Sequence, residues 1–352
     1  MINAKKWVLI FLSLTLAILI GLAAIAYIID PFFQFRVRDN TYKLSSWFVS
    51  SGLIENYDYD TLIIGSSMTQ NFTMDVVREE LGVHPLKIGI GGIRPSEMEA
   101  LLNLAYEEHK ANDYIICVDL TFFTQDDEGN RYPKYLLKKD FLSRMQYFLS
   151  YDTWFRYIPV DIAFISLENA GVNLPEKIAK STSIDWLDDY RMDVTYSEEN
   201  ALSDYRRIKS QPIEPPSSRL YEEMCARIDG FLNGFDFAAG NHTFFFPPYS
   251  SLFWCDTQEK GQLETYLRAK EYFVEKASKY GASVYDFQAA DCTMILDNYM
   301  DISHYSPEIN DWIIKCFANG EFRVQPENYY ETLDKLIGNT KNLMRDLECS
   351  AF

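Results

Sequence analysis

Two short segments of the chain carry residues that could perform nucleophilic chemistry. The first is Ile64-Gly65-Ser66-Ser67-Met68, which directly follows the apolar run Thr61-Leu62-Ile63. In open α/β sheets, ligands bind beyond the carboxyl ends of the strands, and a serine there lies over the amino end of the next helix, where free N–H groups and the helix dipole favour negative charge. The alternative is that these serines only cap that helix.

The second segment is Asp301-Ile302-Ser303-His304-Tyr305, followed by Ser306-Pro307. Its spacing lets Asp301 reach the imidazole of His304, and a histidine oriented by a carboxylate can take a proton from a serine and return it to a leaving group. Histidine has many structural uses, so an ordinary surface loop is the competing interpretation. His242, which begins the apolar run before Pro247-Pro248, is a weaker candidate for ligand binding.

The elements that must position these segments follow from an alternation of apolar runs and helical periodicity. Strands are expected over 61–64, 86–90, 114–118, 243–246 and 283–287, and helices over 69–81, 95–109, 260–280, 307–317 and 326–347. Strands that alternate with helices predict an α/β protein, with a parallel sheet and helices on both faces. Residues from about 125 to 240 fit this alternation poorly, and we interpret them as a helical insertion.

Three sequence blocks, in this order along the chain, resemble those of SGNH/GDSL hydrolases. They are Gly65-Ser66-Ser67, Gly89-Ile90-Gly91-Gly92 and Asp301-x-x-His304. The resemblance covers roughly residues 59–125 and 240–318, and it implies a three-layer fold of the SGNH/flavodoxin-like kind. By position in the first block, it makes Ser67 the nucleophile.

The same resemblance implies how the site is divided among these residues. Ser67, His304 and Asp301 form the catalytic triad. The oxyanion hole takes backbone N–H groups from Ser67 and from the second block, where either Gly91 or Gly92 is the donor. The family's third block usually reads Gly-x-Asn-Asp, and its asparagine completes the oxyanion hole. Here the third strand ends in Val118-Asp119-Leu120-Thr121, so the third donor is left unassigned.

Within the family, the chain, with its N-terminal apolar segment, more closely resembles the subgroup that includes the D-alanyl transfer protein of lipoteichoic acid and the alginate acetylation proteins. Those proteins act beside membrane-bound O-acyltransferases. The resemblance therefore implies a serine esterase or O-acyltransferase that acts on a cell-envelope polysaccharide or a similar acyl ester, with a membrane-bound O-acyltransferase as a candidate partner. The alternative is a non-catalytic binding or scaffold protein that keeps the fold beside such a partner.

The apolar segment covers residues 7–29, which contain no charged side chain. At about 1.5 Å per residue it spans roughly 35 Å, enough to cross a bilayer. Lys5 and Lys6 precede it, so the positive-inside rule predicts a cytoplasmic N-terminus and an extracytoplasmic remainder. A signal peptide cleaved after Ala24-Ile25-Ala26 is the alternative, although the run is long for one. We expect an anchor over 1–30, a juxtamembrane segment over 31–57 and an SGNH-like domain over 58–352.

The composition limits the remaining function classes. The 352 residues carry a formal net charge of −18, and 47% are hydrophobic. A strongly acidic surface repels phosphate backbones, so we expect no nucleic-acid binding. The six cysteines form no CxxC pair and no cluster typical of metal ligands occurs, so neither a metal nor a cofactor is expected. Cys117 lies in an apolar run and is expected to be a buried thiol.

Overall fold

The computed structural model describes residues 4–38, 45–127, 129–173, 175, 183–212 and 217–350. The chain divides into two compact units. Unit 1 comprises residues 1–57 and 131–184, and unit 2 comprises residues 58–130 and 185–352. The predicted insertion of about 125–240 is therefore divided between the two, because its first part packs with the residues that follow the N-terminal helix while its second part packs with the sheet.

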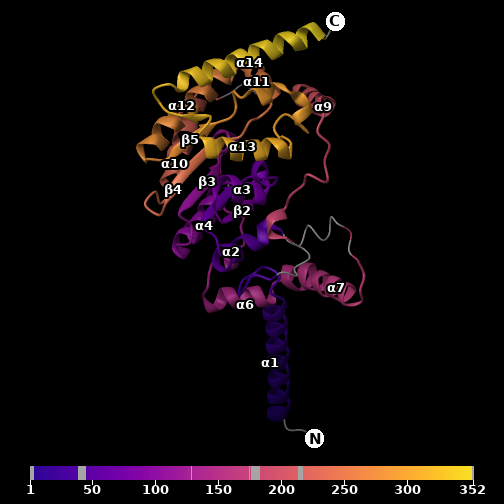
Figure 1. Cartoon of the computed structure of the whole chain (residues 1–352). Helices are drawn as coiled ribbons and strands as arrows, with labels where there is room; N and C mark the ends of the chain where they lie inside the picture. The colour runs from indigo at the N-terminus through magenta and orange to yellow at the C-terminus, as the bar shows by residue number, and fades with distance from the viewer. Residues whose placement is uncertain are drawn as a thin grey trace. The chain divides into compact units, whose positions relative to one another are not determined.

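Unit 2 is built on a mostly parallel sheet, which confirms the predicted α/β class (Figure 1). In the described part of the chain the sheet has six strands in the order β2-β1-β3-β4-β5-β6. Their bounds are β1 Thr61–Gly65, β2 Pro85–Gly89, β3 Asp113–Cys117, β4 Asn241–Phe246, β5 Ser283–Asp286 and β6 Arg323–Val324. The edge strand β6, which pairs antiparallel with β5, was not predicted, because two residues are too few to show a pattern.

Helices and short helical turns flank this sheet (Figure 1). They are η1 Ser67–Thr69, α3 Met74–Leu81, α4 Pro95–Glu108, α5 Thr121–Thr124, α9 Glu198–Lys209, α10 Leu220–Asn233, α11 Ser251–Glu259, α12 Leu263–Lys279, η5 Asp291–Met294, η6 Leu296–Asn298, α13 Pro307–Asn319 and α14 Tyr329–Ser350. Helix α3 packs against α13, and α10 packs against α12. The central strands are buried on both faces, as their continuous apolar sequences require.

The helix predicted over 69–81 is wrong in its first part. A 3₁₀ turn, η1, covers Ser67–Thr69, and the α-helix begins only at Met74. The reason is that side chains from elsewhere take the intervening carbonyl groups. Lys87 Nζ donates to the carbonyl oxygens of Gln70 and Phe72 at 2.5 and 3.3 Å, and Arg191 donates to that of Asn71 at 2.6 Å.

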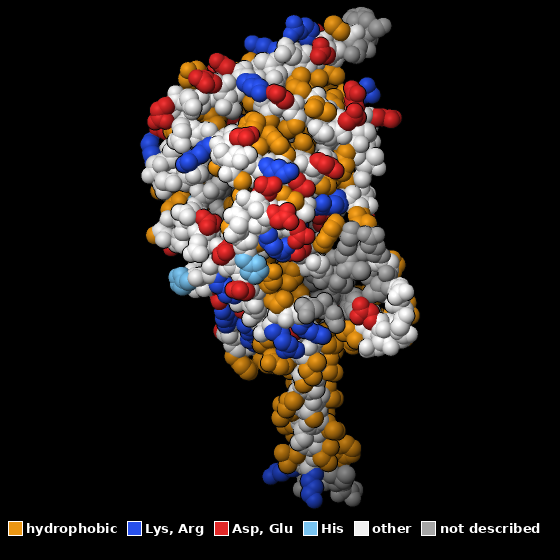
Figure 2. All heavy atoms as spheres, viewed as in Figure 1, with side chains coloured by type: hydrophobic (Ala, Val, Ile, Leu, Met, Phe, Trp, Pro, Cys, Tyr) orange, Lys and Arg blue, Asp and Glu red, His pale blue; other side chains and the backbone are white. Residues whose placement is uncertain are grey.

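Unit 1 contains the N-terminal helix and the first part of the insertion. Its elements are α1 Ala4–Ile29, α2 Ser46–Asn56, η2 Lys134–Leu136, α6 Phe141–Leu149, the π-helical turn η3 Asp152–Tyr157 and α7 Ile158–Asn169; the turn η4 Ile184–Trp186 begins at the boundary with unit 2. Helix α1 is long and apolar enough to cross a membrane, a property that signal sequences share. Hydrophobic side chains cover it along its length (Figure 2).

All six cysteines lie in the described part of the chain, and there they are free thiols. Cys117, at the end of β3, is fully buried, as its apolar sequence context predicted.

Close packing around Cys117 explains why the last residue of β1 is a glycine. A Cβ atom at Gly65 would lie 2.5 Å from Cys117 Cβ and 2.6 Å from Thr69 Cγ2, so only glycine lets η1 return this closely over the sheet.

Candidate active site

The candidate site lies within unit 2, where the order of the strands changes direction. The chain passes from β1 to β2 on one side and then crosses to β3 on the other, so the loops after β1 and β3 diverge. Such a point is the usual place for a ligand crevice in an open α/β sheet. Ser67 follows β1 here, Gly92 follows β2 and Asp119 follows β3, and all three line one cavity of about 190 Å³.

The structure brings together the three residues that the sequence predicted as a triad. Ser67 Oγ lies 2.8 Å from His304 Nε2, and His304 Nδ1 lies 2.7 Å from Asp301 Oδ2. The other carboxylate oxygen of Asp301 accepts the backbone N–H groups of Ser303 and His304 at 2.7 and 2.8 Å. With Nδ1–H donating to Asp301, Nε2 is left to accept the hydroxyl proton of Ser67.

Burial and charge act in opposite directions on this pair. Burial alone would lower the pKa of His304, but the hydrogen bond and charge of Asp301, with more distant carboxylates of Asp119 and Asp204, outweigh it and raise that pKa above its ordinary value. Burial alone would raise the pKa of Asp301, but the hydrogen bond and charge of His304 and the two backbone N–H groups hold it below its ordinary value. Asp301 therefore stays ionised and stabilises an imidazolium.

These directions predict the pH dependence of ester hydrolysis. Because the neutral imidazole is the base, activity should rise with pH along a limb that lies above the ordinary histidine value of about 6.5. Asp301→Asn removes the charge that raises the pKa of His304 and leaves the burial that lowers it. The pH range over which activity rises should then move to lower pH, and kcat should fall by about 10⁴. Profiles of kcat and kcat/KM against pH measure the two effects. A pH range that does not move would contradict the claim that Asp301 raises the pKa of His304.

The turn that carries Ser67 is tied to the segment that carries His304. The carbonyl oxygen of Met68 accepts the hydroxyl of Tyr305 and the side-chain amide of Asn310, each at 3.0 Å and each buried. The carbonyl oxygen of Met68 therefore joins the turn that carries Ser67 to the loop that carries His304 and to the first turn of α13. The sequence contained no signal for these two residues, because their shared partner is 237 and 242 residues away along the chain.

Tyr305→Phe tests this positioning, since it removes one hydroxyl and little volume. We expect kcat to fall by about tenfold with KM nearly unchanged, because the loss of roughly one hydrogen bond loosens Ser67 relative to His304. Steady-state kinetics well below the unfolding temperature measure the change. Tyr329→Phe is the matched control, because that buried hydroxyl donates to Asp286 instead. Equal effects of both variants on kcat would show that Tyr305 has only a structural role.

Tyr190 is a further site residue that sequence reasoning missed. Its ring meets the His304 ring edge-on at a centroid distance of 6.2 Å, and its hydroxyl lies 3.5 Å from the carbonyl oxygen of Ser67. The backbone N–H of Tyr190 donates to Asn71 Oδ1 at 3.1 Å, and this hydrogen bond fixes Tyr190 against the segment that follows Ser67. Tyr190 belongs to the part of the insertion that packs in unit 2. No periodicity distinguishes it from the other tyrosines of that region.

The geometry favours one of the two candidate glycines for an oxyanion hole. Gly92 lines the cavity beside Ser67, whereas Gly91 is not among its lining residues. Gly92 has a φ of +64°, which favours glycine. Because η1 has only three residues, the charge stabilisation expected from a helix dipole is small, and individual N–H groups must hold an oxyanion instead.

Asp119 occupies the place where the related block usually has asparagine. It is buried, lines the same cavity as Ser67 and accepts a hydrogen bond from the hydroxyl of Tyr249. Burial raises the pKa of Asp119, against the hydrogen bonds of Ser66 and Tyr249 and the charge of His304. An ionised carboxylate accepts hydrogen bonds and cannot donate one to an oxyanion as the amide of asparagine does, so the third donor stays unassigned.

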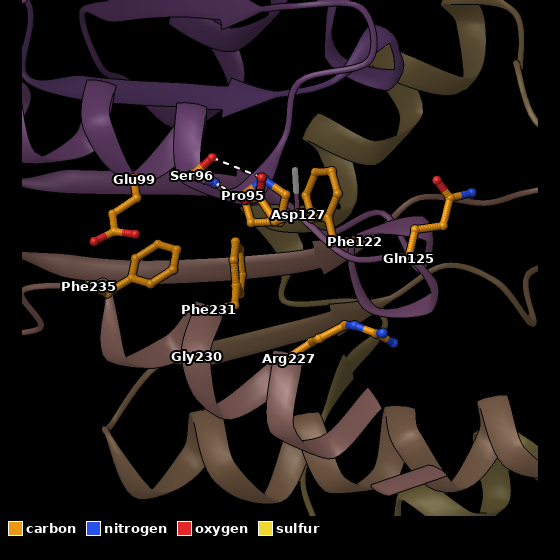
Figure 3. Close-up of a pocket in the computed structure, with 10 residues that line it drawn as sticks. All are labelled: Pro95, Ser96, Glu99, Phe122, Gln125, Asp127, Arg227, Gly230, Phe231 and Phe235. Atoms are coloured by element: carbon orange, nitrogen blue, oxygen red, sulfur yellow. Dashed lines mark hydrogen bonds between the residues drawn. The ribbon is translucent and has the colours of Figure 1, made fainter. Parts of the chain in front are cut away.

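The cavity at Ser67 continues away from the triad. It shares Gly92, Ile93, Thr121 and Phe122 with a second cavity of about 420 Å³. The second shares Pro95, Phe122, Gln125 and Asp127 with a third, of about 210 Å³. Figure 3 shows this third cavity between α4 and α10, with the rings of Phe231 and Phe235 facing Pro95 and Glu99.

Two other expectations concern His242 and metal binding. His242 lies at the amino end of β4, at the edge opposite the carboxyl ends where Ser67 lies, and it is not among the residues that line the cavity at Ser67. It is buried between the hydroxyl of Tyr106 at 2.9 Å and the carbonyl oxygen of Gly240 at 3.0 Å. Among the described residues, no group of three or more His, Cys, Asp or Glu side chains could hold a metal ion.

No model of a known protein family matches the sequence, and no curated protein matches it. The chemistry of the site and the resemblance of its sequence motifs are therefore the grounds on which a function can be proposed.

Proposed function

We propose that this protein is an SGNH-type serine esterase or O-acyltransferase with Ser67 as nucleophile, His304 as general base and Asp301 as the group that orients His304. The observation that carries the proposal is the continuous hydrogen-bonded chain from Ser67 Oγ through the imidazole to Asp301. Two segments 237 residues apart meet at the separation that a covalent acyl transfer needs.

In this mechanism His304 Nε2 takes the proton of Ser67 as Oγ attacks an ester carbonyl carbon. The backbone N–H groups of Ser67 and Gly92 stabilise the oxyanion, at roughly 3 kcal/mol for each well-placed donor. The imidazolium then gives its proton to the leaving alcohol oxygen as the C–O bond breaks. Water or a sugar hydroxyl, deprotonated by His304, attacks the acyl-enzyme and releases Ser67.

The residues that line the cavity at Ser67 and the cavity next to it support an acyl ester of a polyhydroxy compound as substrate. Apolar side chains, Met68, Ile93 and Phe253 among them, line the small cavity at Ser67 and suit a short acyl group. The adjoining cavity has Thr121, Gln125 and Asp127 on its wall, which suit the hydroxyl groups of a sugar. We propose a cell-envelope polysaccharide as the acceptor and a membrane-bound O-acyltransferase as the partner that supplies the acyl group.

The proposal includes an uncleaved membrane anchor with the sheet-containing unit outside the cytoplasm. The last turn of α1 belongs to the core of unit 1, where Ala26 and Ile29 pack with Ile158. Asp30, which is fully buried, accepts three backbone N–H groups from residues 34–36 and the hydroxyl of Tyr147 at 2.8 Å. Cleavage after Ala26 would remove part of this core, so retention of α1 is favoured over a signal peptide.

Active-site labelling of the full-length protein in detergent tests the central claim. A fluorophosphonate should modify wild-type protein, and peptide mapping should place the adduct on Ser67. Incubation with an activated acyl ester, with and without an oligosaccharide, then separates hydrolysis from transfer by the products formed. A folded wild-type protein that takes no label would exclude an activated serine and leave the scaffold alternative.

A further inference from the structure

Unit 1 exposes an unusual amount of apolar surface outside α1. Of twelve large hydrophobic side chains that are exposed elsewhere in the described residues, eight lie between Phe141 and Val172. Phe141 and Leu142 are each 76% exposed, and Phe155 is 72% exposed. Single exposed apolar residues are ordinary, but a concentration of them in one short segment marks a surface that contacts an apolar partner.

The helices of this segment already bury one side against the rest of unit 1, so the exposed apolar side chains lie on their opposite, solvent-facing side. In α6, Ser143 and Tyr147 are one turn apart and are buried, while Leu142 and Leu149 lie on another side and are exposed. Tyr147 is tied inward by its hydrogen bond to Asp30. The apolar residues therefore face outward from helices whose other side is already packed.

The segment is attached to the end of the apolar helix α1. Ile158 of α7, with Phe148 and Trp154, packs on the last turn of α1. Helices α6 and α7 run across the axis of α1 at that end (Figure 1). In the space-filling view, hydrophobic side chains continue from α1 onto the part of unit 1 that surrounds its end (Figure 2). The exposed apolar face of α6–α7 is thus continuous with the surface that a bilayer would cover.

The two units of the chain differ in net charge. Unit 1 has 13 Lys and Arg against 8 Asp and Glu, a net charge of +5, of which Lys5 and Lys6 supply +2 at the N-terminal end of α1. Unit 2 has 20 Lys and Arg against 43 Asp and Glu, a net charge of −23. The strongly acidic character of the chain therefore belongs to unit 2 alone. A basic unit with an exposed apolar face is the combination that binds the interface of an anionic bilayer.

We propose that α6, η3 and α7 form a membrane-contact surface that lies in the headgroup region of the leaflet at the C-terminal end of α1. This inference rests on α1 being a retained membrane span. The occupant is lipid, because the surface is continuous with α1 and belongs to the unit of the chain that has a net positive charge. Tyr151 and Phe155, whose rings stack at a centroid distance of 5.1 Å, supply the aromatic residues typical of that depth.

Photo-crosslinking of the full-length protein in nanodiscs that contain phosphatidylglycerol tests the proposal. p-Benzoylphenylalanine replaces Leu142 or Phe155 in separate variants, both at exposed positions that leave packing intact. Leu14 of α1 is the positive control, and Tyr330 of α14, which is 58% exposed, is the control in unit 2. Irradiation should add the mass of one lipid at positions 14, 142 and 155, and none at 330.

Two outcomes would overturn the proposal, and they have different meanings. Lipid adducts at Leu14 but none at Leu142 or Phe155 would leave the anchor in place and exclude the contact surface. Absence of adducts at all four positions would exclude both the anchor and the surface. The same variants irradiated in native membranes distinguish the occupants, because crosslinks to a protein in place of lipid at 142 and 155 would assign this face to a protein partner.

Discussion

Replacement of Ser67 by alanine should lower the rate of activated-ester hydrolysis by about four to six orders of magnitude, leaving only the residual acceleration that the oxyanion hole and substrate binding supply. The reason is that Oγ is the protein atom that bonds to the acyl carbon in the proposed mechanism, and alanine removes both this atom and the hydroxyl proton that His304 takes in the first step. Release of the alcohol from a p-nitrophenyl ester measures the rate, and fluorophosphonate labelling measures loss of the nucleophile directly.

Ser66→Ala is the matched control, because Ser66 precedes Ser67 in the same turn. Its hydroxyl accepts the backbone N–H of Met68 at 3.3 Å, which caps η1. Loss of a cap costs about 1 kcal/mol of stability, so this variant should keep most of its labelling. His304→Ala should resemble Ser67→Ala, since members of a triad act as a unit. Labelling that survives in Ser67→Ala would exclude Ser67 as nucleophile.

Replacement of Lys270 by methionine should destabilise unit 2 by about 3–5 kcal/mol, which corresponds to a fall of roughly 10 °C in the unfolding temperature. Lys270 Nζ lies 2.7 Å from Asp286 Oδ2 and 2.6 Å from Gln288 Oε1, and Lys270 and Asp286 are both fully buried. Tyr329 also donates to Asp286, at 2.6 Å, so the pair joins α12, β5 and α14. Methionine fills similar space but leaves a buried carboxylate without its cation.

Thermal unfolding of the full-length variants measures this effect. Lys279→Met is the matched control, because Lys279 pairs with Glu275 at 2.6 Å on the surface, where both side chains are more than half exposed. Such a pair contributes about 0–1 kcal/mol, so unfolding should hardly change. The double variant Lys270→Met with Asp286→Leu should recover most of the loss, since no charge is then left buried. Equal unfolding temperatures for Lys270→Met and Lys279→Met would contradict this account.

Much of the fold could be read from local sequence. Short apolar runs placed five strands of the sheet within a few residues, because a strand buried on both faces needs no long-range information to be apolar. Helix ends were equally local: α3 ends at Gly82 in the left-handed conformation, and α4 begins with Pro95. The weak point was the insertion, whose mixed sequence does not show which unit its parts pack with.

The residue types and spacings of Ser67 and of Asp301 with His304 determined which side chains could react. The last two are close in sequence, so a local turn brings them together. Only the tertiary structure decided that Ser67 meets His304, because that contact joins the loop after β1 to a loop 237 residues later.

Tertiary structure also decided what surrounds this site. The turn at Ser67 is a short 3₁₀ turn, since Lys87 and Arg191 take the carbonyl groups that a longer helix would use. Tyr190 reaches His304 from the insertion, and Tyr305 and Asn310 converge on Met68. Such contacts depend on which distant segments pack together. Local sequence thus determined the strands and the reactive residues, whereas packing between distant segments decided how those residues are held.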